Sequence, residues 1–183
     1  MSDSFATSLL QRLRRLNRAE RTVLMRASFI GRHFSLAVLT DITVLTEERV
    51  REVLDKACTL QFIVRESRCG DWYAFRHALI RDIAYAEFIG THVRPIHRRI
   101  ARALERCAET SETALDNLAY HSWAGGDAAR CLRYNELAGD QATAAFASQG
   151  AQAYYARARE FVGPHSEEYR RLTNKIARLH STG

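Results

Sequence analysis

The sequence predicts a mainly α-helical protein with one small β-hairpin. Apolar residues recur three and four positions apart through most of the 183 residues, as they do along the buried face of a helix. Only 2 prolines and 9 glycines interrupt these patterns. The exception is 62–76, where β-branched and aromatic residues lie on both sides of a turn signal. We therefore expect two parts, residues 1–90 with the hairpin and residues 91–183 made of helices.

Local signals mark the ends of the first two helices. The first helix is expected over 5–16. Asn17 follows it, and Glu20 three positions later completes a capping box for the second helix. That helix is expected to reach about Ile30 and to stop at Gly31, because glycine is common just past the end of a helix.

Two more capped helices precede the hairpin. Ser35 caps a short helix over 36–42, and Thr46 caps a helix that reaches about Leu60. The two strands of the hairpin are predicted over 62–66 and 72–76. The helix capped by Asn17, these two helices and a two-stranded hairpin follow one another in the order of a winged helix.

The rest of the chain is expected to form helical hairpins. Seven helices are predicted, over 77–88, 93–107, 113–124, 127–138, 139–147, 151–161 and 167–180. Asp127 is expected to cap the fourth of them. The pair over 139–147 and 151–161 resembles one tetratricopeptide repeat, because Gly139, Ala151 and Tyr155 fall near its small and aromatic positions. The preceding helices do not keep the same register at that repeat's period of about 34 residues. We therefore predict hairpins of this repeat type without a regular array.

A motif lies where the hairpin passes into the next helix. The segment Phe75-Arg76-His77-Ala78-Leu79-Ile80-Arg81-Asp82, together with Tyr85, resembles the end of the winged-helix domain in STAND proteins. These are signal-transduction ATPases with numerous domains, and they include bacterial LuxR-type regulators and ATPase-linked cyclases. The resemblance covers roughly residues 10–162.

The resemblance implies a fold and a role for one histidine. In that family a superhelix of tetratricopeptide-like repeats follows the winged helix. The histidine equivalent to His77 contacts the phosphates of bound ADP and helps to hold the inactive state. Arg76 and Arg81 are candidates for the same interface, but the family pattern does not require them to touch nucleotide. The alternative is that His77 caps backbone groups or packs where two domains meet.

The phosphate-binding loop of an ATPase is not present in this sequence. Such a loop needs the pattern G-x-x-x-x-G-K-[ST], and neither of the two lysines, Lys56 and Lys175, follows a glycine. We therefore expect no cofactor in this chain, and ADP or ATP only where the chain is joined to an ATPase domain. By the resemblance, the chain is either a fragment of a longer protein or a stand-alone remnant.

The positive charge suggests two kinds of partner. The formal net charge is +6, and nearly all of the positive charge is arginine. One cluster lies in the first two helices. A second lies on one face of the helix over 93–107, and it includes Arg94, Arg98, Arg99 and Arg102. These arginines form either a solvated surface or a docking face for an acidic protein or nucleic acid.

The helix over 46–60 is the candidate for reading DNA, and its charge argues against that role. The helix carries four acidic residues, Glu47, Glu48, Glu52 and Asp55, and three basic residues, Arg49, Arg51 and Lys56. Its net charge is therefore −1. A helix in the major groove needs basic or amide side chains for the bases and the phosphates. We therefore expect the winged helix to serve for packing.

Neither a catalytic nor a metal site is predicted. The sequence has no H-E-x-x-H and no G-x-S-x-G, and the spacing of His92 and His97 does not suit a shared metal. The four cysteines have no C-x-x-C spacing, so we expect reduced thiols in a cytoplasmic protein without a membrane partner. The sequence thus favours a non-catalytic regulatory module that couples the sensing of a partner or ligand to an ATPase or output domain. The alternative is a DNA-binding winged-helix regulator of transcription.

Overall fold

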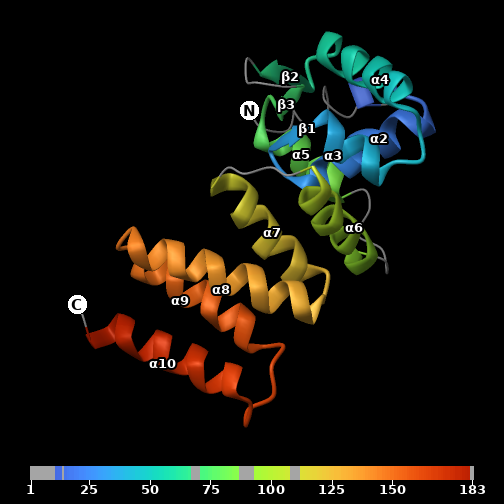
Figure 1. Ribbon diagram of the computed structural model, residues 1–183. Coiled ribbons are helices and arrows are strands. Elements are labelled where there is room, and N and C mark those ends of the chain that lie inside the picture. The colour runs from blue at the N-terminus through green and yellow to red at the C-terminus, as the bar shows by residue number, and fades with distance from the viewer. Residues whose placement is uncertain (1–10, 14, 67–70, 87–92, 108–111, 182–183) are drawn as a thin grey trace. The chain divides into compact units, whose positions relative to one another are not determined.

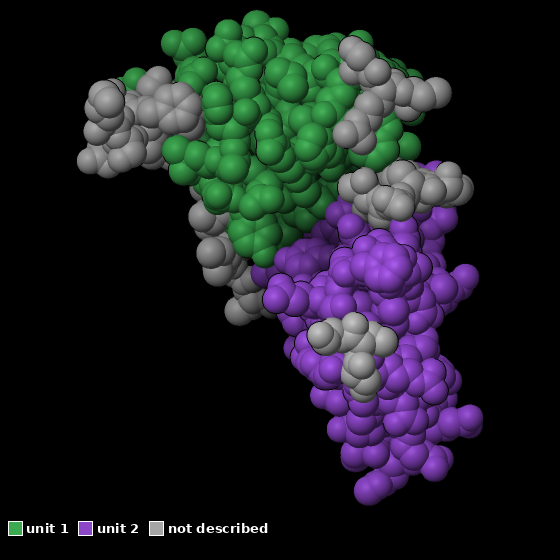
Figure 2. Space-filling model, turned by 90° about the vertical axis from the view of Figure 1, so that its left-hand side faces the viewer, with its two compact units in different colours: residues 1–92 green, residues 93–183 purple. Residues whose placement is uncertain are grey.

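The chain is mainly helical, with one small antiparallel sheet (Figure 1). The computed structural model describes residues 11–13, 15–66, 71–86, 93–107 and 112–181. The chain forms two compact units, residues 1–92 and 93–183 (Figure 2).

Unit 1 consists of helices arranged around a three-stranded sheet. Its elements are α2 (Arg18–Ile30), β1 (His33–Ser35), α3 (Leu36–Ile42), α4 (Glu47–Thr59), β2 (Ile63–Glu66), β3 (Trp72–Phe75) and α5 (Ala78–Ala86). The strands lie in the order β1-β3-β2, and both pairings are antiparallel. The predicted helix over 5–16 falls mostly outside the described residues, of which 11–13 are helical.

The predicted caps of unit 1 are confirmed. The Asn17 side chain accepts a hydrogen bond from the Glu20 N–H (2.9 Å), and the Asn17 N–H donates to the Glu20 carboxylate (2.8 Å). Ser35 accepts from the Val38 N–H at the start of α3, and Thr46 caps α4 in the same way. The N–H of Gly31, the residue that ends α2, bonds to a carbonyl of its last turn.

The prediction of a two-stranded hairpin was wrong in one respect, because β1 adds a third strand. Phe34 of β1 pairs with Tyr73 of β3, and their rings stack with centroids 5.9 Å apart. Phe75 packs on the same ring of Phe34, at 5.6 Å. All three side chains are fully buried, so this aromatic cluster anchors the sheet in the core of unit 1.

Unit 2 is a stack of helices. Its elements are α6 (Val93–Arg106), α7 (Glu112–Ala124), α8 (Ala128–Ala144), α9 (Ser148–Arg159) and α10 (Glu167–Ser181). Each helix packs chiefly against the helices before and after it in the chain. Asp127 caps α8 as predicted, since its carboxylate accepts from the Arg130 N–H. Ala151, Tyr155 and Ala158 of α9 form a buried cluster with Leu172 of α10.

The predicted break between residues 138 and 139 was wrong. The helix α8 continues through Gly139 to Ala144, and the turn comes at Phe146, whose φ is 58°. Gly139 serves packing instead, because a Cβ there would lie 2.4 Å from the Tyr155 ring. The second half of α8 and the helix α9 therefore pair as the predicted hairpin, but without a separate first helix.

Candidate functional site

His77 lies at the junction between the sheet and α5. The Arg76 N–H donates to the Phe62 carbonyl (3.0 Å), and the His77 carbonyl accepts from the Ile80 N–H to start the helix (3.0 Å). The side chains of Arg76 and His77 are exposed. Arg81 contacts the carboxylate of its neighbour Asp82 (2.8 Å). The backbone around His77 is thus held firmly, while its imidazole is accessible from outside unit 1.

Every cation of α4 is engaged with a carboxylate. Arg49 pairs with Glu52, and Lys56 pairs with Glu20 of α2 (2.8 Å). Burial raises the pKa of Glu20, but hydrogen bonds from Lys56 and from the Asn17 N–H outweigh this effect and hold the pKa below its ordinary value. The buried carboxylate of Glu20 therefore serves twice: it completes the capping box of α2 and it pairs with Lys56 of α4.

Arg51 connects α4 to the sheet. Its guanidinium bonds to Asp71 just before β3 (2.7 Å) and to Glu47 one turn earlier (2.8 Å). Arg65 of β2 reaches the same Asp71 carboxylate (3.0 Å). The hydrogen bond from Arg51 holds the pKa of Asp71 below its ordinary value. The basic side chains of this helix thus stabilise unit 1 rather than pointing to solvent without a counter-charge.

The arginines predicted on one face of α6 are exposed there together. Arg94, Arg98, Arg99 and Arg102 share this face, while His97, Ile100, Ala101, Ala103 and Leu104 are buried on the other. Arg98 also has a structural task, because its guanidinium donates to the carbonyls of Gly125 (2.6 Å) and Gly126 (3.2 Å) at the end of α7. A Cβ at Gly125 would lie 2.9 Å from the Arg98 backbone nitrogen, so this approach requires glycine.

A buried histidine pair, which was not predicted from the sequence, joins α6 to α7. The Nδ1 atoms of His97 and His121 are 2.7 Å apart, and Tyr120 packs edge-on against both rings. One imidazole donates this hydrogen bond and the other accepts it. Burial lowers the pKa of His97 to about 4. A histidine at apolar helical spacing, four residues after Val93 and three before Ile100, was the signal for its burial.

The described residues hold no cluster of three or more His, Cys, Asp or Glu side chains that could bind a metal ion. In the histidine pair the two Nδ1 atoms already bond to each other.

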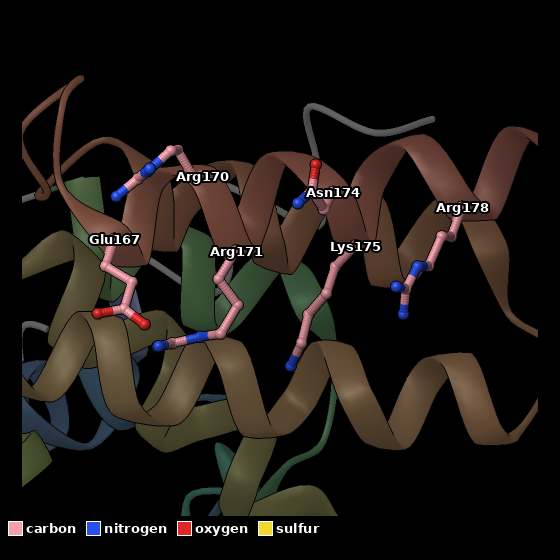
Figure 3. Close-up of a pocket in the computed structure, with 6 residues that line it drawn as sticks. All are labelled: Glu167, Arg170, Arg171, Asn174, Lys175 and Arg178. Atoms are coloured by element: carbon pink, nitrogen blue, oxygen red, sulfur yellow. The ribbon is translucent and has the colours of Figure 1, made fainter.

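A basic hollow of about 490 Å³ lies along α10 (Figure 3). Its lining residues are Glu167, Arg170, Arg171, Asn174, Lys175 and Arg178. Arg171 and Lys175 extend away from α10 in Figure 3 and form ion pairs with Glu136 of α8 (2.8 and 2.9 Å). Lys175 also reaches Asp140 (2.6 Å). Two of the four cations in this hollow therefore fasten α10 to α8.

The structure distributes the predicted site residues over both units. Arg76, His77 and Arg81 belong to unit 1, and the arginines of α6 belong to unit 2. No family model, curated protein or solved structure matches the chain. Among the helices described, none combines the length and the apolar character that crossing a membrane requires.

Proposed function

We propose that the chain is the non-catalytic regulatory and interaction module of a STAND-type signalling ATPase, coupling the sensing of a partner to an ATPase or output domain. The order α2-β1-α3-α4-β2-β3 and the sheet order of unit 1 support a winged helix. The stacking of α6 to α10 supports tetratricopeptide-like hairpins, which characteristically bind proteins along extended faces. Cys58 and Cys131 are free thiols, which supports a place in the cytoplasm.

The observation that carries the proposal is the contrast between α4 and α6. Each cation of α4 is bound to a carboxylate of unit 1, so DNA phosphates would have to break these ion pairs before they could use them. The arginines of α6 instead lie exposed on one face. This distribution favours an acidic protein surface as the partner over the major groove.

Fluorescence anisotropy tests this proposal. The full chain is titrated into a labelled 30-base-pair duplex of random sequence and into labelled polyglutamate, each from about 50 to 200 mM salt. We expect binding of polyglutamate to weaken at least fivefold in the double variant Arg99→Glu, Arg102→Glu. The matched control is Arg49→Gln, Arg51→Gln on α4, which should leave it unchanged. Submicromolar duplex binding that depends on the α4 pair would instead support the DNA-binding alternative.

The role proposed for His77 requires an ATPase domain, in cis or in trans. The isolated chain should bind neither ATP nor ADP at micromolar concentration in calorimetry. In the joined protein, one hydrogen bond to a charged phosphate is worth about 1.5–3 kcal/mol, so His77→Ala should speed ADP release about ten- to a hundredfold. Arg81→Ala is the control. An unchanged release rate beside a large fall in Tm would assign His77 to packing alone.

A further inference from the structure

An apolar hollow of about 380 Å³ lies on unit 1, along α2 from Arg18 to Arg26. Its apolar floor and walls come from Ala19 and Val23 of α2 and from Val44 and Leu45 in the turn between α3 and α4. This volume is within the range of about 300–1,000 Å³ that is typical of binding pockets. A smaller hollow of about 200 Å³ lies alongside, and the two share Arg18 and Thr22.

Folding of unit 1 does not account for Val44. This β-branched side chain is 84% exposed, although it lies in a turn where polar residues are usual. The turn itself is well held. The Thr43 N–H bonds to the Thr40 carbonyl (3.1 Å), and Arg26 of α2 donates to the Ile42 carbonyl (2.6 Å). The hollow is therefore a fixed feature of the surface, and it leaves apolar area in contact with water.

Positive charge lies beside the two hollows. Arg18 lines both of them and Arg21 lines the smaller one. Both arginines are exposed on α2 and form no ion pair with any described residue. The single acid of α2, Glu20, is buried and bound to Lys56, so it does not neutralise them. A partner that fits this surface must combine apolar side chains with carboxylates.

The hollow follows α2 for about two turns. Its lining residues Ala19, Thr22, Val23 and Arg26 have the spacing i, i+3, i+4, i+7. Seven residues of helix rise about 10 Å, which is also the span of the anchors that an amphipathic helix presents at the same spacing. The length of the hollow thus matches about two turns of a helical ligand.

We propose that this hollow binds an acidic amphipathic helix of a partner protein. Its apolar anchors would contact Val44 and Leu45, and its carboxylates would face Arg18 and, beside the smaller hollow, Arg21. The proposal goes beyond the function given above, because it assigns a second surface that uses neither His77 nor the arginines of α6. It can hold whether or not the chain belongs to a STAND protein.

A selection with a defined probe tests the proposal. A phage library of random 16-residue peptides is selected against the full wild-type chain, and the recovered peptides are measured by anisotropy. We expect acidic sequences with apolar residues at i, i+3 or i+4, and i+7. Their affinity should fall at least tenfold in Val44→Asp and at least fivefold in Arg18→Glu, Arg21→Glu.

The matched control is Phe146→Ser, which changes another highly exposed apolar residue, in unit 2, and should leave peptide affinity within twofold. Circular dichroism melts check that Val44→Asp folds, which its exposure favours. Basic peptides, binders that are insensitive to Val44→Asp, or a selection that returns none would overturn the proposal. So would self-association of the wild-type chain in sedimentation that Val44→Asp abolishes, because the occupant would then be a second copy.

Discussion

The stability of unit 2 should depend on pH through the buried imidazole of His97, which pairs with His121. Burial lowers the pKa of His97 to about 4, below the ordinary value of 6.5. Between these values the unfolded chain binds a proton that the folded chain does not, so the free energy of unfolding rises with pH. Acidification from pH 7 towards pH 4 should therefore remove about 1–3 kcal/mol through His97 alone.

Urea unfolding at pH 7 and at pH 5 measures this effect. The loss of stability on acidification should be smaller in His97→Gln than in the wild type, because the glutamine does not titrate. His165→Gln, at an exposed position, is the control and should keep the wild-type difference. An identical difference in all three proteins would show that His97 does not contribute to the pH dependence.

Two glycines of unit 2 should respond oppositely to the same substitution. A Cβ at Gly139 would meet the Tyr155 ring at 2.4 Å, whereas at Gly150 nothing outside the glycine's own surroundings lies closer than 3.9 Å. Gly139→Ala should lower the free energy of unfolding by about 1–3 kcal/mol through overpacking. Gly150→Ala should raise it by up to about 1 kcal/mol, because alanine favours helix. Thermal melts with the same sign for both variants would contradict this assignment.

At the scale of the element, α2 depends on its first turn. Asn17→Ala removes the acceptor for the Glu20 N–H and should destabilise the chain by about 0.5–2 kcal/mol. Asn17→Ser, which keeps a side-chain oxygen, should restore most of that loss. Urea unfolding followed by circular dichroism compares the two. A serine variant as unstable as the alanine variant would mean that the cap contributes little.

Local signals predicted the elements well, because the caps at Asn17, Ser35 and Asp127 are contacts made within one helical turn. The strand β1 was missed, since its three residues acquire their pairing from β3, about forty residues later. Gly139 was taken for a helix end because its partner, the Tyr155 ring, lies on another helix.

The candidate sites were predicted less completely than the elements. The exposed arginines of α6 follow from helical spacing, and the structure places them on one face. The His97–His121 pair and the hollow at Val44 depend on how separate elements pack, and no local pattern encodes that. The ion pairs that engage α4 are likewise tertiary, although the excess of acids in that helix pointed the same way.

At the scale of the whole molecule, the two units should fold as separate fragments. Unit 1 keeps its own core around Phe34, Tyr73 and Phe75, and the helices of unit 2 bury theirs against one another. We expect residues 1–92 and residues 93–183, each produced alone, to show cooperative melts in far-ultraviolet circular dichroism.

A shorter fragment provides the control. Residues 1–76 lack α5, which packs on α2 and holds the Tyr85 ring with its centroid 4.5 Å from that of Phe29. This fragment should therefore be largely unfolded. Loss of structure in residues 93–183 alone would show that the helical stack requires unit 1.

The neighbour-on-neighbour packing of unit 2 also affects how it moves. In a linear array, the last helix has one main interface, so α10 loses mainly its contacts with α9 when it detaches. The inner helix α8 would lose its interfaces with both α7 and α9. Opening can therefore proceed from the last helix inward without global unfolding. The ion pairs from Arg171 and Lys175 to Glu136 oppose the detachment of α10. Added salt weakens such pairs. Ionic strength should therefore set how often Leu172 separates from the Tyr155 cluster. Each such opening exposes the apolar face of α9 to solvent and to other proteins.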